Sequence, residues 1–150
     1  MPFAEKVNWV NVGVTAVVAT LYFVVVLGQL GQHAAGEIAY QVPLLTAVGA
    51  AIVLTIVSTI LVAIGSSISS VIEGGDPAKD LDRKDERDKD IERRGEVVGY
   101  YVASAGVVGV MAITMLGYEH FWIASGLYAS FAVASIVSSA VKIVAYHRGF

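Results

Sequence analysis

Long runs without a charged residue dominate the pattern of hydrophobic and polar positions along this chain. The stretches 7–36, 38–72, 97–118 and 120–141 contain no Asp, Glu, Lys or Arg. Each supplies the roughly 20 apolar residues that cross a bilayer core of about 30 Å. In hydrocarbon the backbone must satisfy its own hydrogen bonds, and barrel strands alternate over about 10 residues, so these runs must be helices. The pattern predicts an all-α, integral membrane four-helix bundle.

The whole chain reads as a single transmembrane domain. Its predicted helices cover residues 8–28, 43–72, 97–116 and 121–145. Pro43 suits the first turn of a helix, where its missing N–H costs nothing. The second run is longer than the bilayer core, so we expect its Ser-rich end to project into the headgroups or the helix to tilt. Most Ser and Thr lie in the second and fourth helices, which we therefore expect to be central.

A charged segment at 73–96 separates the second helix from the third, and it holds ten acids and seven bases. Acidic residues precede basic ones by four positions at Asp80/Lys84, Asp85/Lys89 and Asp90/Arg94, and each such pair favours a helix by a few tenths of a kcal/mol. The segment is either a separate linker helix or the start of one long rod that continues through Gly95.

The distribution of Lys and Arg predicts the orientation. Seven of the ten basic residues lie in the charged segment, none lies in the connections near 29–41 and 117–120, and Lys6, Lys142 and Arg148 flank the outer helices. Basic residues stay on the cytoplasmic side. We therefore expect a multi-pass protein of the cell (inner) membrane with both termini in the cytoplasm, whose first helix is an uncleaved anchor.

A short internal repeat leaves the origin of the bundle open. Ile-Val-Ser-Thr at 56–59 matches Ile-Val-Ser-Ser at 136–139. Either the chain contains two duplicated helical hairpins of the same orientation, or the match of these common membrane residues arose by chance.

Composition excludes several classes of chemistry. Hydrophobic residues make up 56% of the chain, and there is no Cys, which removes disulfides, thiol redox chemistry and thiolate metal sites. The net charge of −3 without a basic stripe argues against nucleic acid as a partner. No carboxylate, Lys, Arg or His lies near a predicted helix midpoint, so a proton relay and a catalytic centre within the membrane are not expected.

Two groups of residues are candidates for a site. The first is a metal site on the outer side, for which His33, Glu37, Glu119 and His120 are the weak candidates. Polar residues at a wet interface are the simpler interpretation, so we expect no cofactor and no metal. The second is a partner-docking surface on the charged segment, for which the candidates are Asp85, Glu86, Arg87, Arg93 and Arg94. The alternative for this segment is a solvated linker that only fixes the orientation.

The charged segment also resembles a known group of proteins. Asp85-Glu86-Arg87, followed by Ile91 and by Arg93-Arg94-Gly95 just before an apolar helix, is similar to the Asp-Glu-Arg loop of small prokaryotic multi-pass membrane proteins of unknown function. The resemblance covers about the central third of the chain. It implies a bacterial or archaeal source and a cytoplasmic loop between hydrophobic hairpins.

These observations predict a non-enzymatic accessory or interaction protein in the lipid bilayer. We expect a homo-oligomer whose charged segment docks a cytoplasmic protein partner or a second copy. The alternative is a small oligomeric channel or transporter, lined by the Ser and Thr residues of helices 43–72 and 121–145.

Overall fold

The computed structural model describes residues 3–72 and 86–148, and these residues are all-helical apart from the connections. Within this part of the chain, the long helices are α1 (Phe3–Gln29), α2 (Gln41–Ile72), α4 (Glu86–Met115) and α5 (His120–Arg148). A short 3-10 helix, η1 (Ala35–Glu37), lies between α1 and α2. All four long helices have the length and apolarity to cross a membrane. The predicted fold class is confirmed.

The largest difference from the predicted boundaries is at the start of α4. The expected helix begins at 97, whereas α4 begins at Glu86 and runs without a break through Gly95. Residues 86–96 of the charged segment are thus the first turns of a membrane-spanning helix, while residues 73–85 lie outside the described part. The structure therefore has the continuous rod rather than a separate linker at this end of the segment. The other helices extend their predicted bounds by a few residues.

Local sequence signals explain where the helices start and stop. Gly117 has φ of 75°, and its N–H bonds the carbonyl of Thr114 while the N–H of Tyr118 reaches that of Ile113. This is the Schellman arrangement, in which a glycine adopts the left-handed conformation after a helix. It makes the tight turn that places α5 antiparallel to α4. Pro43 lies in the first turn of α2, as predicted.

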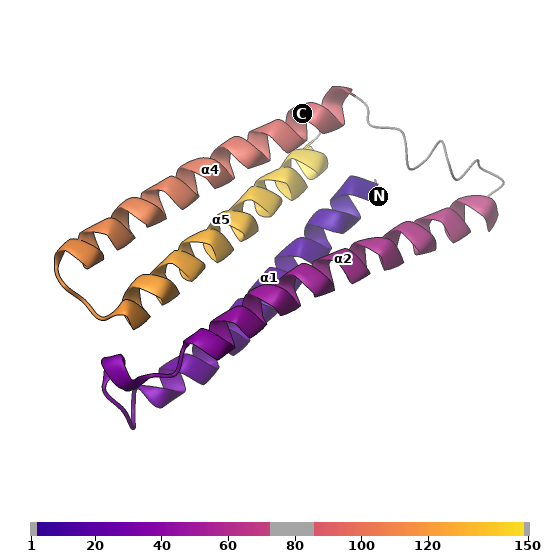
Figure 1. The fold of residues 1–150 in the computed structure, drawn as a ribbon. Helices are drawn as coiled ribbons and strands as arrows, with labels where there is room; N and C mark the ends of the chain where they lie inside the picture. Colours follow the sequence, from indigo (N-terminus) through magenta and orange to yellow (C-terminus); the bar gives the residue numbers. More distant parts are fainter. Residues whose placement is uncertain (1–2, 73–85, 149–150) are drawn as a thin grey trace.

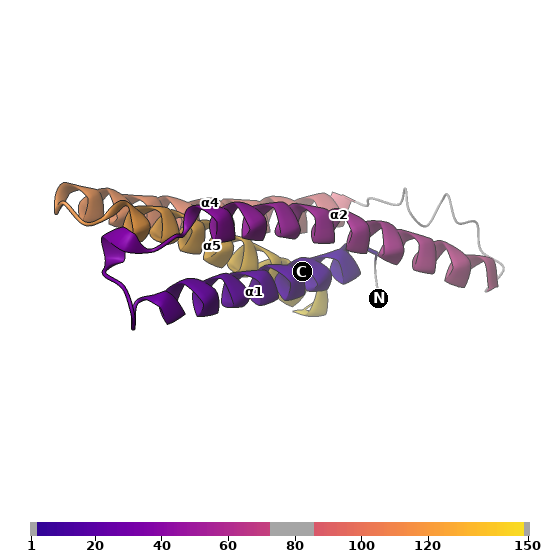
Figure 2. The same ribbon diagram turned by 60° about the horizontal axis from the view of Figure 1, so that its bottom comes forward.

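The helices pack in the order α4, α5, α1, α2 (Figure 1). The view in Figure 2 shows α5 between α4 and α1. The expectation of a central fourth helix is therefore right for α5. It is wrong for α2, which packs against α1 and lies at the edge of the bundle. Both hairpins are present, but the contact of α1 with α5 has no comparable counterpart between α4 and α2.

Both described ends of the chain lie at one end of the bundle. The start of α1, the end of α5, the end of α2 and the start of α4 are gathered there, and the two short connections lie at the opposite end (Figure 1). We call these the open end and the turn end. With 32 residues, α2 is about 48 Å long and extends past the start of α1. This agrees with the expectation that its Ser-rich end leaves the bilayer core.

Aromatic and aliphatic packing is concentrated toward the turn end. Val26 and Phe121 are fully buried there, together with Val18 and Tyr22 of α1 and Ala47 of α2. The polar side chains gather at the open end instead, which places the candidate site away from this core.

Close approach of the backbones joins α4 to α5. Gly95, Gly99 and Gly106 lie on one face of α4 because they are spaced by four and seven residues. A Cβ at Gly99 would lie 2.9 Å from Cβ of Ser138, and one at Gly106 would overlap Ser130. Small residues allow such contact, which replaces the missing hydrophobic drive between helices in lipid.

We predict that Gly99→Leu destabilises the bundle, because its side chain must displace the backbone of α5. Overpacking of this kind costs about 1–3 kcal/mol. The measurement is the free energy of unfolding in mixed micelles. Gly109→Leu is the matched control, since nothing lies within 4 Å of a Cβ there. Equal loss of stability in both variants would contradict the α4–α5 contact.

Candidate functional site

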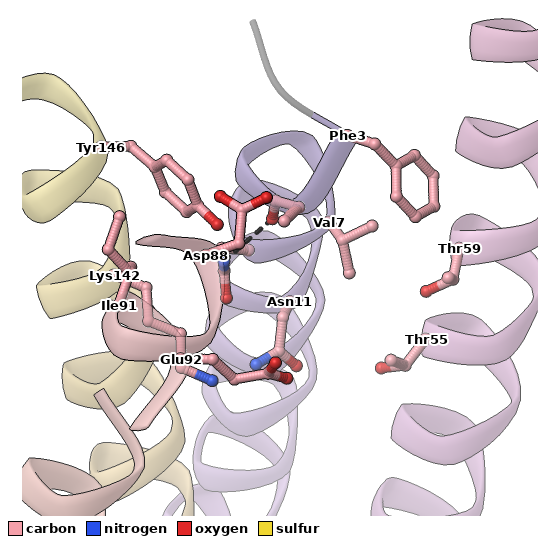
Figure 3. A pocket seen from close by; sticks show the side chains of 12 residues that line it. Phe3, Val7, Asn11, Thr55, Thr59, Asp88, Ile91, Glu92, Lys142 and Tyr146 are labelled. Atoms are coloured by element: carbon pink, nitrogen blue, oxygen red, sulfur yellow. Dashed lines mark hydrogen bonds between the residues drawn. The ribbon is translucent and has the colours of Figure 1, made fainter. Parts of the chain in front are cut away.

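A polar cavity of about 290 Å³ lies at the open end of the bundle. Each of the four long helices contributes two polar side chains to its lining (Figure 3). These side chains are Asn8 and Asn11 of α1, Thr55 and Thr59 of α2, Asp88 and Glu92 of α4, and Lys142 and Tyr146 of α5. Phe3, Ala4, Val7 and Ile91 complete it. The polar cavity is the place where side-chain polarity of all four helices converges.

Helical spacing brings each pair of polar residues to one face. The pairs on α2, α4 and α5 are four residues apart, and the pair on α1 is three apart, so both members point the same way. In Figure 3, Thr55 and Thr59 face α1 across the cavity, and Tyr146 points its hydroxyl toward Asp88. These two side chains bring the start of α4 and the end of α5 together at the cavity.

A hydrogen-bonded seam joins α1 to α5 next to the polar cavity. The side-chain amide of Asn11 donates to the hydroxyls of Ser139 at 2.9 Å and Ser135 at 3.2 Å. Eleven residues further along α1, Tyr22 and Ser125 share a buried hydrogen bond of 2.9 Å. Polar groups without partners are costly in hydrocarbon, so these bonds both satisfy the side chains and fix the register of the two helices.

A buried carboxylate extends this seam at the open end. The side chain of Glu5 is only 8% exposed, and its Oε1 lies 3.3 Å from Nδ1 of His147. The same nitrogen lies 3.0 Å from the carbonyl oxygen of Ile143. Because two acceptors face Nδ1, this nitrogen carries a hydrogen. On the other side of α1, Lys6 donates to the hydroxyl of Ser66 on α2 at 3.5 Å.

The charges of the polar cavity define its chemistry. Asp88 and Glu92 carry one negative charge each and Lys142 carries one positive charge, so the lining sums to −1. Carboxylates only accept hydrogen bonds, whereas the ammonium of Lys142 only donates them. The lining therefore offers both acceptors for a cationic group and a donor for an anionic one. Such a surface suits a ligand that carries both charges.

The predicted docking residues divide into three groups. Asp85 lies outside the described residues. Glu86 and Arg87 form the first turn of α4, and Arg93 and Arg94 lie two turns further along. All four of these side chains are exposed. Glu86 and Arg93 lie on the side of α4 opposite Ile91 and Gly95, which are buried against the bundle, whereas Arg87 lies one turn before Ile91 on the same side.

The weak metal candidates lie at the turn end, and all four are exposed. Glu119 packs against the η1 segment, because a Cβ at Gly36 would lie 3.2 Å from its Oε2. The connection that carries His33 and Glu37 therefore lies next to the one that carries Glu119 and His120. Among the residues described, however, no group of three or more His, Cys, Asp or Glu side chains could hold a metal ion.

The hydroxyls expected to line a path take several roles. Ser67, Ser69 and Ser130 each bond the carbonyl four residues earlier in their own helix. Ser135 and Ser139 bond α1 instead. The groove between α2 and α5 is mostly apolar. The channel alternative thus has no supporting observation in the described residues and stays a prediction.

Sequence reasoning missed the polar cavity, although a signal was present. Glu5, Asn8 and Asn11 recur every three residues in an otherwise apolar run, which marks one face of a helix. Lys142 and Tyr146, four residues apart, likewise mark one face at the end of α5. Comparisons of the chain with protein-family models, with curated proteins and with solved structures found no match.

We predict that Asn11→Leu lowers the free energy of unfolding by about 1 kcal/mol, since interhelical hydrogen bonds in membranes contribute about 0.6 kcal/mol on average and about 1.7 at most. The double variant with Ser139→Ala should be less destabilised than the sum of the single variants. Asn8→Leu is the control, because Asn8 donates to the carbonyl of Ala4 in its own helix. Additive effects at Asn11 and Ser139 would contradict the seam.

Proposed function

We propose that this protein is a non-enzymatic interaction protein of the cell membrane, which uses the charged start of α4 to dock a cytoplasmic protein or a second copy of itself. One observation carries the proposal: the charged residues are part of the same rigid helix that crosses the membrane. A surface held in this way needs little ordering when a partner binds, which reduces the entropic cost of association.

The geometry of α4 supports a docking role for one face. Ile91 and Gly95 are buried toward α5 and α1, and Asp88 is half-buried. The rest of the helix surface around this buried strip carries exposed acidic and basic side chains. We call this the docking face, and it consists of Glu86, Arg87, Lys89, Asp90, Arg93 and Arg94.

Mixed charge makes the docking face selective. A face with only acidic or only basic residues would attract any surface of opposite charge. A face on which acidic and basic residues are mixed binds well only to a partner whose charges have the complementary pattern. The same face can pair with itself in an antiparallel arrangement, since it offers both signs. This property supports self-association as well as docking of a different protein.

Orientation rests on the positive-inside rule. The start of α1, the start of α4 and the end of α5 carry Lys and Arg, and all three lie at the open end. The two connections at the turn end contain no Lys or Arg. We therefore place the open end, both termini and the docking face in the cytoplasm. The resemblance to small prokaryotic membrane proteins with a cytoplasmic Asp-Glu-Arg loop agrees with this placement and stays a prediction.

The test is charge reversal on the docking face. We expect Arg93→Glu with Arg94→Glu to reduce in-cell cross-linking to a partner or to a second, differently tagged copy by at least about tenfold, which corresponds to about 1.4 kcal/mol. Introduced photoreactive residues at Asp90 would report both kinds of neighbour by mass spectrometry. Arg93→Lys with Arg94→Lys is the matched control, because it keeps both positive charges.

The amount of protein in the membrane should be the same for all variants, since both residues are exposed. Unchanged cross-linking after charge reversal, in both the partner and the second-copy measurement, would refute the docking role.

A further inference from the structure

Two hollows follow one another along the gap between α2 and α5. The first is the polar cavity. The second, which we call the apolar groove, has a volume of about 540 Å³ and is lined by side chains such as Leu44, Val48, Ile52, Leu127 and Phe131. It opens sideways between the helices because α2 lies at the edge of the bundle and packs mainly against α1.

Residues one helical turn apart on α1 and α2 line the two hollows. Thr15 lines the apolar groove one helical turn beyond Asn11 of the polar cavity, and Ala51 lies one turn beyond Thr55. Ser135 of the groove accepts a hydrogen bond from Asn11. Residues 44–59 of α2 border both hollows and extend about 23 Å. We call the two hollows together the depression. It is polar at the open end and apolar from the middle of the helices to the turn end, where Leu44 and Ala124 line it.

This order of polarity matches that of a lipid in the same leaflet. Lys142 follows directly after the charge-free run 120–141, so the polar cavity lies at the depth of the headgroups. The apolar groove then continues toward the bilayer centre. Half of a bilayer core is about 15 Å, so the acyl chain of such a lipid reaches the part of the groove lined by Ser135, Phe131 and Ile52.

The charges select among headgroups. The carboxylates of Asp88 and Glu92 face the cavity with Lys142, and Thr55 and Thr59 add hydroxyls on the opposite wall (Figure 3). A primary ammonium has three donors for these acceptors, whereas a quaternary ammonium has none. The ammonium of Lys142 suits a phosphate. A headgroup with only negative charge would meet a lining that sums to −1.

We propose that this depression binds one aminophospholipid of the phosphatidylethanolamine class. The carboxylates of Asp88 and Glu92 receive its primary ammonium, Lys142 binds its phosphate, and one acyl chain enters the apolar groove beside Ser135, Phe131 and Ile52. The inference does not depend on the docking face. The lipid adds to the packing of α2, whose main contacts within the bundle are with α1.

The experiment is lipid retention after extraction from vesicles that contain equal amounts of phosphatidylethanolamine, phosphatidylcholine and phosphatidylglycerol. Native mass spectrometry of the extracted protein should show one bound phosphatidylethanolamine, in at least about tenfold excess over each of the others, since a tenfold ratio needs only about 1.4 kcal/mol. Asp88→Asn with Glu92→Gln should abolish this preference. Ile52→Trp, which fills the groove from an exposed position, should lower retention of all three lipids.

Asp90→Asn with Glu96→Gln is the matched control, because it removes two exposed carboxylates from the same helix without touching the cavity. It should leave the preference unchanged. The free energy of unfolding of each variant, measured without added lipid, separates loss of the site from loss of the fold. Equal retention of the three lipids, a preference for phosphatidylglycerol, or an unaltered preference in Asp88→Asn with Glu92→Gln would overturn the proposal.

Discussion

Hydrocarbon offers no hydrogen bonds, and this constraint governs the rest of the structure. The backbone responds by forming four long helices, because only an internal ladder of hydrogen bonds satisfies every peptide group in lipid. Side chains respond in two ways. Most polar residues lie at the open end, near water and headgroups. The few that lie deeper, such as Asn11 and Tyr22, find partners on the neighbouring helix.

The position of α5 follows from the same constraint. Since lipid is as apolar as Leu or Val, helices gain little from burying those residues against each other. The helices must therefore be held together by close packing and by hydrogen bonds, and α5 makes both kinds of contact. Its small residues meet Gly99 and Gly106 of α4 on one side, and its hydroxyls meet α1 on the other. By contrast, α2 offers mainly branched apolar side chains, so it stays at the edge and leaves the two hollows open.

Much of the fold could be predicted from the sequence, and the reasons are physical. Charge-free runs longer than 20 residues specify membrane helices, and Gly117 and Pro43 mark local geometry. The neighbours of each helix could not be predicted, since α2 carries branched apolar residues on every side and its periodicity does not distinguish a packed face from a lipid face. The predicted start of α4 at 97 is wrong because the charge-free run begins there, whereas the helix continues back through Gly95, whose missing side chain admits Lys142 and Ser138 of α5.

The candidate site was predicted only in part, for a related reason. Arg93 and Arg94 stand out because charge is rare in this chain, and the structure leaves them exposed. The polar cavity escaped notice because its residues come from four helices that are distant in sequence. Asp88 and Glu92 were read as members of a charge run, although they lie on the inner face of α4. Only the packing order of the helices joins them to Asn11 and Lys142.

Thiol labelling tests most directly whether lipid surrounds these helices and whether the open end lies in the cytoplasm. The chain has no cysteine of its own, so each introduced cysteine is labelled alone. Single cysteines would replace Glu37 at the turn end, Val108 on the exposed side of α4, and Arg94 at the open end. We expect a membrane-impermeant thiol reagent to label the Glu37 variant in intact cells, the Arg94 variant only after permeabilisation, and the Val108 variant only in denaturing detergent. Labelling of the Val108 variant in intact membranes, or of the Arg94 variant in intact cells, would contradict the account.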